Sequence, residues 1–403
     1  MKTRPFQHTI SLDEARAIIE RTVRPLTRTE RLPLASARGR VVASAIVSTA
    51  DVPPFSRAAM DGYAIRAADT AGASPSTPRT LSCIEEIFTG QMPQRTIAAG
   101  ECAAVATGAP MPAGADAVIM VEETTAIGVL VSVMATVQPR QNVGAQGADI
   151  GTGQTVIEDG TVLNASRLGA IAALGITSVE VYARPRVAIL STGNEIVEPG
   201  QPLAPGQIYD INRFALAAVV DEHGGIAVPH RTAADTLDDL STAVDACLGE
   251  DVLVFSGGSS VGERDLILDV LASRGEVLFH GIAVKPGKPT AFGRIRDTLV
   301  FGMPGYPTSC LSNAYILLAP ALRQLARLPA RLARTVSLRL GARVVSVAGR
   351  HQFYTVRVVD GTAMPAFKAS GDITSMSQAD GYIEIPADTE VVEAGALVDV
   401  TLF

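Results

Sequence analysis

Polar turns rich in Gly and Pro follow a series of short apolar runs between residues 186 and 307. Residues 186–190 and 251–255 are almost continuously apolar, as expected of strands that are buried on both faces of a sheet. Segments with helical spacing separate these runs, and alternating strands and helices are typical of a doubly wound α/β domain. Ligands of such domains bind beyond the carboxyl ends of the strands. The sequence therefore predicts a binding site in these turns.

The four turns are all rich in groups that bind anions or metal ions. They carry Lys285 and Lys288, several hydroxyl groups, and the carboxylates of Glu195, Glu263 and Asp265. Glycines and helix N-termini present free N–H groups to anions, so this composition indicates a phosphorylated ligand with a divalent metal. The turns comprise residues 191–195, 256–263, 285–289 and 302–309.

Capping residues predict the helices between the strands. Asn212 can begin a helix that ends before Gly224, and Asp235 and Asp265 can begin two more. A last helix is expected over residues 308–328. Near the N-terminus, Ser11 and a glutamate three residues later form a capping-box pattern.

The rest of the chain divides by composition. Residues 1–50 and 142–182 contain one helix each, the second over 166–174, and are expected to pack together as an N-terminal and linker domain. Residues 51–141 predict a β-rich domain, 183–328 the α/β domain, and 329–403 a β domain resembling a barrel. Turns of this last domain are expected at Gly349, Gly361, Gly371 and Gly381.

Composition excludes several classes of protein. The net charge of -7 is evenly spread, which argues against nucleic-acid binding. No stretch of 18 uncharged apolar residues and no signal-peptide pattern occurs, so we expect a cytoplasmic protein without a membrane segment. The four cysteines are far apart and the five histidines lack ligand spacing, which predicts reduced thiols and no histidine-based metal site.

Two loops in the β-rich block offer candidate functional residues. Asp61 lies in a turn-rich stretch over 53–64, and Thr107 begins a Pro- and Gly-rich loop over 107–118. Rigid loops of this kind hold backbone N–H groups in place, yet they also occur as plain surface connections. The residues alone leave both alternatives open.

Six motifs in order resemble those of the MoeA family of molybdopterin molybdenumtransferases, which includes the E domain of gephyrin. The resemblance implies that the chain inserts molybdate into adenylylated molybdopterin, with release of AMP that depends on Mg²⁺. It also implies a homodimer whose active cleft is shared between subunits, and contact with a molybdopterin-adenylylating protein and with molybdoenzymes. The motifs are Ala-Met-Asp-Gly-Tyr-Ala around Asp61 and residues 107–112, 191–195, 206–212, 256–263 and 285–289.

The resemblance implies a role for each matching residue. Lys285 and Lys288 would hold the oxyanion with Ser309, because two ammonium groups can offset a dianion. Asp61, Thr107 and Glu195 would also be catalytic. Glu195, Asp235 and Asp265 would bind Mg²⁺, although each acid taken singly is also explained as a helix cap. The substrate would lie against Ser256, Gly257, Gly258, Ser260, Gly262, Pro304 and Gly305.

Four positions depart from the family pattern, of which one, Ser259 in place of a valine, is mild. Tyr306 replaces an asparagine in the Pro-Gly-Asn-Pro loop, while Gly144 and Ala148 replace an arginine and a glutamate. These departures leave two alternatives to the molybdenum-inserting enzyme. One is a divergent paralogue acting on another pterin or nucleotide, and the other is a binding or scaffold protein without catalysis.

Overall fold

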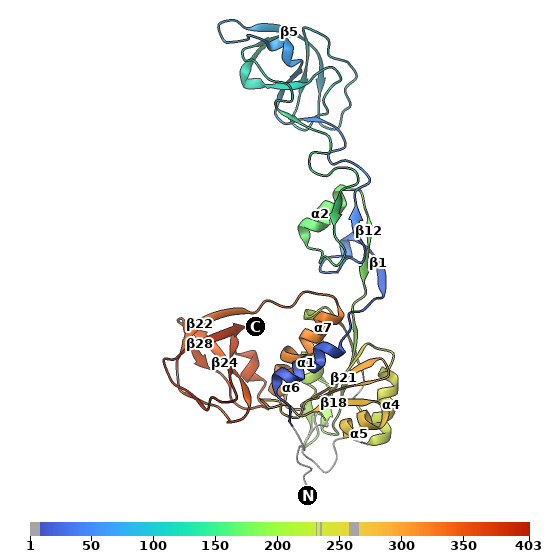
Figure 1. The fold of residues 1–403 in the computed structure, drawn as a ribbon, viewed down its shortest axis with the longest axis vertical. Coiled ribbons are helices and arrows are strands. Elements are labelled where there is room, and N and C mark those ends of the chain that lie inside the picture. Colours follow the sequence, from blue (N-terminus) through green and yellow to red (C-terminus); the bar gives the residue numbers. More distant parts are fainter. Residues whose placement is uncertain (1–8, 231, 234–235, 258–265) are drawn as a thin grey trace. The chain divides into compact units, whose positions relative to one another are not determined.

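The computed structural model describes residues 9–230, 232–233, 236–257 and 266–403. The chain folds as two compact units, one formed by Met1–Glu30 with Tyr182–Phe403 and the other by Arg31–Val181 (Figure 1). We describe each unit by itself. No helix within the described residues is long and apolar enough to span a membrane.

A six-stranded sheet forms the centre of the first unit. Its four strands on one side are parallel, which confirms the doubly wound arrangement. The last two strands are antiparallel to their neighbours, a feature that the apolar pattern did not predict. In spatial order the strands are β16 (Ile226–Pro229), β13 (Arg186–Ser191), β17 (Val252–Ser256), β21 (Thr298–Met303), β20 (Ala291–Ile295) and β18 (Glu276–His280).

Helices cover both faces of this sheet. Val187 and Ile189 of β13 point into one core cluster, while Ala188 and Leu190 point into another, as the two-residue period of a strand requires. The first cluster is completed by α1 (Leu12–Thr22), α3 (Asn212–Glu222) and α7 (Ala319–Leu325). The second is completed by α4 (Leu237–Cys247) and α5 (Leu266–Arg274), which lie together in Figure 1.

Helix α1 begins as predicted, because the Ser11 hydroxyl accepts a hydrogen bond from the Glu14 N–H at 3.1 Å. Its packing differs from the expectation. Leu12, Ile18 and Ile19 join the α/β core, whereas packing against residues 142–182 was predicted. Helical periodicity identifies a buried face, but it does not identify the surface that covers this face.

The first residues of the other helices differ from several predictions. Asn212 is the first residue of α3 rather than its cap, and the Asp210 carboxylate accepts the Arg213 N–H at 3.0 Å. Thr236 caps α4, whereas Asp235 and Asp265 lie outside the described residues. The expected helix over 308–328 is divided into α6 (Pro307–Asn313), a π-helical turn and α7. The π-helical turn, Ala314–Leu318, lies just before Pro320, which has no N–H to continue the regular pattern.

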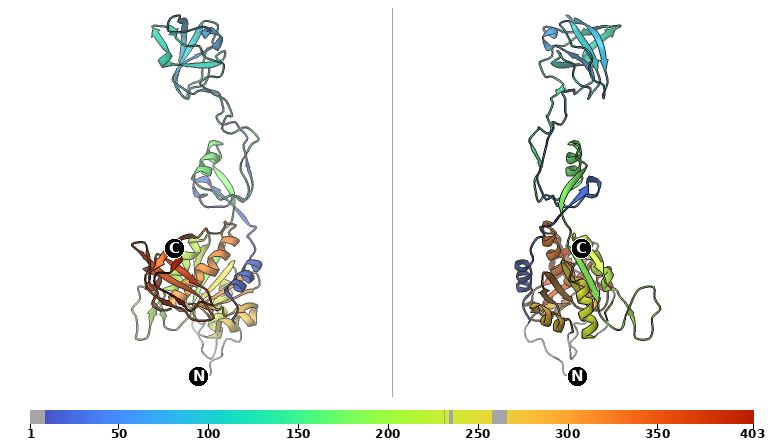
Figure 2. Two further views of the ribbon diagram at one scale, coloured as in Figure 1. Left: turned by 60° about the vertical axis from the view of Figure 1, so that its left-hand side comes forward. Right: turned by 90° about the vertical axis from the view of Figure 1, so that its right-hand side faces the viewer.

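The C-terminal strands close into a five-stranded barrel around a core that includes Val356, Ile383 and Val400. This confirms the predicted barrel-like fold (red in Figure 2). Gly349 and Gly361 lie in turns with positive φ and Gly371 also lies in a turn, whereas Gly381 is the first residue of a strand, so the turn predicted at Gly381 itself is wrong. The strands are β22 (Arg334–Leu340), β24 (His351–Val359), β25 (Thr362–Pro365), β26 (Gly381–Ile385) and β28 (Leu397–Leu402).

The second unit contains the predicted β-rich fold. Its six-stranded sheet has the order β7-β4-β6-β5-β9-β8. Helix α2 (Ala165–Ala173) begins one residue earlier than predicted, is capped by the Asn164 side chain, and is followed by Gly175 at φ 74°. The sheet strands are β4 (Gly62–Ile65), β5 (Arg79–Ile87), β6 (Glu101–Val105), β7 (Ala117–Met120), β8 (Thr124–Ile127) and β9 (Leu130–Val133).

Candidate active site

The candidate site lies at the carboxyl edge of the parallel strands. Ser191, Ser256 and Met303 are register partners at the ends of β13, β17 and β21, so the turns that follow these strands are neighbours. The lysine loop, residues 285–289, also lies at this edge, but it does not follow a parallel strand. It belongs to the connection between β18 and β20, whose ends at this edge, His280 and Ala291, are paired. The sheet therefore brings all four predicted turns to one edge.

Three of these turns are in direct contact. A Cβ atom on Gly257 would lie 2.4 Å from the Thr192 carbonyl oxygen, and Gly257 has φ 104°. The Thr192 N–H donates to the Ser256 carbonyl oxygen at 2.9 Å. A Cβ on Gly305 would lie 3.4 Å from the Gly257 Cα. Glycine is therefore required at position 257 by close packing as well as by backbone conformation.

Helix α3 supports the third of these turns. The Asn212 side-chain amide donates to the Gly305 carbonyl oxygen at 2.8 Å. Asp210, which is 3 % exposed, fixes the start of the same helix. The motif over 206–212 therefore contributes to the site by holding the turn after β21, a role that its sequence did not reveal.

Helix α6 holds the lysine loop. The buried Asn313 amide donates to the Gly287 carbonyl oxygen at 2.8 Å and also to the Thr290 hydroxyl. That hydroxyl donates to the same Gly287 oxygen at 2.9 Å. A Cβ on Gly287, which has φ 102°, would lie 2.3 Å from the Asn313 nitrogen. The backbone between Lys285 and Lys288 is thus fixed at its centre.

Replacing Asn313 tests this support. In Asn313→Ala the Gly287 oxygen loses a buried donor, so the free energy of unfolding should fall by about 1–3 kcal/mol. Thr290→Val removes the second member of the triangle, and the two changes together should cost less than their sum, because they disrupt one network. Urea denaturation of the two single variants and the double variant measures this coupling. Strict additivity would show that the two side chains act independently.

Several buried polar atoms near the site have no hydrogen-bond partner within the described part of the chain. Ser191 and Thr192 are only 2 % and 4 % exposed, yet their hydroxyl oxygens are unpartnered. The same holds for one side-chain oxygen each of Asp210, Asn212 and Asn313. Buried polar groups in proteins are nearly always hydrogen-bonded. The unpartnered oxygens at this edge can therefore form hydrogen bonds with a polar ligand.

Ser256 and Ser309, two predicted hydroxyl residues, are both buried. Ser309 of α6 is 3 % exposed, and the next residue, Cys310, hydrogen-bonds with Ser256. Burial raises the pKa of the Cys310 thiol to about 12, an effect that this hydrogen bond partly offsets. Cys310 therefore stays protonated at neutral pH and does not serve as a nucleophile. The described structure contains no disulfide, and all four cysteines are free.

The acidic residues are only partly described. Glu195 is exposed, and its carboxylate folds back to within 2.8 Å of the position that a Cβ on Gly193 would take. No group of three or more potential metal ligands occurs among the described residues. The remaining predicted residues, Gly258, Ser260, Gly262, Asp235 and Asp265, lie outside the described residues.

The second unit brings Asp61 and Thr107 together. One Asp61 carboxylate oxygen accepts the Thr107 N–H at 2.6 Å and the Thr107 hydroxyl at 2.8 Å. These bonds, the backbone bond first, lower the pKa of Asp61 below its usual value. The exposed pair therefore presents an ionised carboxylate in a fixed orientation.

Tyr306 does not strain the loop in which it replaces asparagine. Its φ of -68° and ψ of 128° are ordinary extended values, so the position does not require a residue that tolerates left-handed angles. The side chain is 67 % exposed and lies toward Gly371 of the C-terminal barrel segment. Gly144, another departure, pairs with Arg57 in a short antiparallel ladder, where a Cβ would meet the Arg57 side chain at 3.4 Å.

Sequence reasoning missed the contribution of the C-terminal segment. The Thr308 N–H donates to the Ser370 carbonyl oxygen at 3.1 Å, and the Thr308 hydroxyl donates to the Asp372 carbonyl oxygen at 2.7 Å. The nearby Lys368 is exposed and donates to the Thr374 hydroxyl at 3.0 Å. A signal existed, because the sequence has lysine only at positions 2, 285, 288 and 368. Two of these four are the lysines of the candidate site.

Comparison with known proteins agrees with this geometry. The MoeA N-terminal region (domains I and II) matches residues 10–175, a probable molybdopterin binding domain matches 188–324, and the MoeA C-terminal region (domain IV) matches 337–403. Two solved MoeA molybdopterin biosynthesis proteins from Pyrococcus horikoshii superpose with TM-scores of 0.87 and 0.81. They are 39% and 30% identical to this chain and cover 98% of it, with 99% and 100% of their own lengths matched.

Relatives that are named as enzymes also match this chain over most of its length. Molybdopterin molybdenumtransferase 2 of Mycobacterium tuberculosis is 34% identical over 391 residues, which cover 94% of this chain and 95% of the relative. The molybdopterin molybdenumtransferase of Haemophilus influenzae is 37% identical over 319 residues, or 78% of each chain. The chain therefore belongs to the MoeA family of molybdopterin molybdenumtransferases, which are transferases of molybdenum cofactor biosynthesis.

Proposed function

We propose that this protein inserts molybdate into adenylylated molybdopterin and releases AMP and the molybdenum cofactor. The observation that carries the proposal is the arrangement at the sheet edge. Three closely packed turns, with unpartnered buried polar atoms, lie beside a rigid loop that contains two lysines. An adenylylated pterin needs such close backbone approach along its phosphates, and molybdate needs concentrated positive charge.

Different residues of the site bind the two anions, the adenylylated pterin and molybdate. Gly257 and Gly305 have no side chains to block the pyrophosphate, and Ser256, Ser191 and Thr192 can supply hydroxyl groups to the pterin or the nucleotide. Lys285 and Lys288 offset the two negative charges of molybdate. Asn313 holds the backbone of their loop in the same conformation when molybdate binds. A preorganised cationic loop loses little free energy to reorganisation during transfer.

Mg²⁺ fits the chemistry of the acidic positions. Glu195 is exposed at the site edge and, together with Asp235 and Asp265, would provide the hard oxygen ligands that this ion prefers. When bound, the ion would stabilise negative charge on the leaving phosphate. Glu195 itself lies against Gly193, which orients its carboxylate at the end of β13.

Asp61 and Thr107 are proposed to complete the site from the partner subunit of a homodimer. Their hydrogen-bonded, exposed arrangement supports this role, because a solvated surface loop has no need to fix a carboxylate with two donors on one oxygen. We propose further that the enzyme is cytoplasmic, receives its substrate from a molybdopterin-adenylylating protein, and passes its product to molybdoenzymes.

Subunit mixing tests the shared cleft. Asp61→Ala and Lys288→Ala chains should each have at most a tenth of the wild-type activity alone, because every cleft in each homodimer lacks one of the two residues. After mixing and exchange, a heterodimer has one intact cleft, so up to half of the activity of a wild-type dimer should return for each heterodimer formed. Native mass spectrometry verifies the exchange. Confirmed heterodimers without activity would contradict the shared arrangement.

A product assay tests the proposed reaction. The purified protein is incubated with adenylylated molybdopterin, molybdate and Mg²⁺, and the mixture is then added to a molybdoenzyme that lacks its cofactor. The molybdoenzyme should gain activity only when all components are present. A failure to activate it, while a known molybdenumtransferase succeeds in parallel, would refute the proposal.

A further inference from the structure

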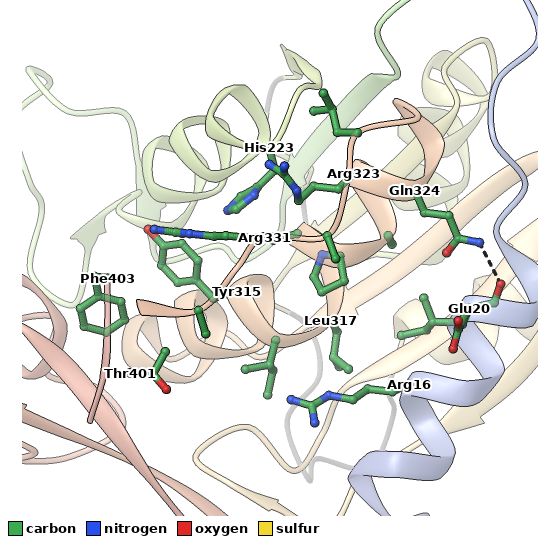
Figure 3. A pocket seen from close by; sticks show the side chains of 18 of the residues that line it. Arg16, Glu20, His223, Tyr315, Leu317, Arg323, Gln324, Arg331, Thr401 and Phe403 are labelled. Atoms are coloured by element: carbon green, nitrogen blue, oxygen red, sulfur yellow. Dashed lines mark hydrogen bonds between the residues drawn. The ribbon is translucent and has the colours of Figure 1, made fainter. Parts of the chain in front are cut away.

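A cavity of about 630 Å³ lies in the first unit, away from the turns of the candidate active site (Figure 3). Its walls come from α1, from the π-helical turn and α7, from residues 330–333 and from the end of the barrel strand β28. None of its lining residues belongs to the four turns at the sheet edge. The cavity is therefore a separate feature of the molecule.

Two arginines lie at one end of this cavity. Arg331 pairs with Glu222 at 2.9 Å, but no carboxylate within the described residues lies within ion-pair distance of Arg323. Its Nε donates a hydrogen bond to the Pro329 carbonyl oxygen at 2.7 Å. Burial and then the nearby Arg331 charge lower the pKa of Arg323, although the residue remains protonated at neutral pH. A half-buried cation beside a second cation is destabilised unless an anion compensates it.

A buried histidine lies beside the two arginines. His223 is 2 % exposed, and within the described part of the chain neither of its ring nitrogens has a hydrogen-bond partner, although Nε2 lies 3.9 Å from the Glu222 carboxylate. Its ring lies edge-on to Tyr315, with ring centres 6.1 Å apart. Burial lowers the pKa of His223, so the neutral ring offers one donor and one acceptor to the cavity.

Away from this end the lining is mainly apolar, although Arg16, Glu20, Gln324 and Thr401 also contribute to it. Ile19, Leu317 and Pro320 contribute aliphatic surface, and Phe403 packs against Tyr315 and Tyr382 with ring centres 5.8 and 5.7 Å apart. Figure 3 shows the labelled His223, Arg323 and Arg331 gathered on one side, while Leu317 and Arg16 lie farther along the cavity. The cavity thus combines a cationic end with an apolar body.

We propose that this cavity binds a small organic anion, with its carboxylate, sulfonate or phosphate group at Arg323, Arg331 and His223 and its apolar body against Leu317 and the aromatic cluster. The charges around the cationic end support an anion, because among the described residues Glu222 is the one carboxylate that faces the two guanidinium groups. His223 could donate a hydrogen bond to the same anionic group. This binding site goes beyond the proposed function and does not depend on it.

Matched fluorescent probes test the proposal. 8-Anilinonaphthalene-1-sulfonate carries an anionic group, whereas N-phenyl-1-naphthylamine has nearly the same apolar body without it. The full-length protein should bind one sulfonate probe per chain, at least tenfold more tightly than the uncharged probe. In Arg323→Met this preference should fall severalfold, while Arg334→Met, which removes an exposed arginine outside the cavity, should leave it unchanged.

Three results would overturn the proposal. The first is equal affinity for both probes in the wild-type protein, and the second is an unchanged preference in Arg323→Met. The third is failure of the sulfonate probe to bind at all, as expected if a second copy of the chain fills the cavity. A melting temperature of Arg323→Met close to that of the wild type confirms that the variant is folded, so a lost preference reports on the cavity itself.

Discussion

Lys288→Ala should lower the rate of molybdenum insertion by at least tenfold, about 1.4 kcal/mol of lost transition-state stabilisation. Lys288 lies in a loop whose backbone is held by Asn313 and Thr290, so removal of its side chain leaves the loop in place. Its ammonium group is one of the two that we assign to the molybdate dianion. Steady-state rates at several molybdate concentrations measure the effect.

Two controls separate charge from structure in this experiment. Lys288→Arg keeps the positive charge and should retain more activity than Lys288→Ala, although the guanidinium has a different shape. The melting temperature should change little in either variant, because the side chain is only partly buried. Full activity of Lys288→Ala would remove this residue from the reaction.

Gly257→Ala should disrupt the site more severely. The new Cβ would lie 2.4 Å from the Thr192 carbonyl oxygen, and the backbone at φ 104° disfavours any side chain. Relief requires the turns after β13 and β17 to move apart, which should cost about 1–3 kcal/mol in free energy of unfolding. Displacement of the turns by as little as about 1 Å should lower the insertion rate on the order of a hundredfold.

Gly249→Ala is the matched control for this substitution. Gly249 follows α4 in the same unit, and nothing lies within 4 Å of the position that its Cβ would take. Its stability and activity should therefore stay close to those of the wild type. Equal behaviour of the two variants in urea denaturation and in the insertion assay would show that the close approach at Gly257 is unimportant.

The parallel strands could be predicted because burial on both faces leaves a continuous apolar run. This signal located β13 and β17 and therefore the edge at which the turns meet. The antiparallel pairing of β18 and β20 could not be predicted in the same way, because Glu276 of β18 and Arg294 of β20 interrupt the apolar pattern. The lysine loop therefore lies at the predicted edge, but the antiparallel β18–β20 connection that places it there was not predicted.

Contacts between distant residues account for most of what the sequence did not reveal. Asn313 and Gly287 are 26 residues apart, and Asn212 and Gly305 are 93 apart. An asparagine at the end or start of a helix is an ordinary feature of a sequence, and only the fold shows which carbonyl oxygen its amide meets. The family motifs indicated Asp61 and Thr107 separately, whereas their hydrogen bonds, across 46 residues, required the structure.

The central claim is tested most directly by the dependence of AMP release on molybdate. A single turnover of adenylylated molybdopterin on the purified protein, with Mg²⁺ present, should release one AMP for each molybdenum atom incorporated, and almost none when molybdate is omitted. AMP is measured by chromatography and incorporated molybdenum by elemental analysis of the isolated cofactor. Release of AMP at the same rate without molybdate, or incorporation of molybdenum without AMP release, would contradict the account.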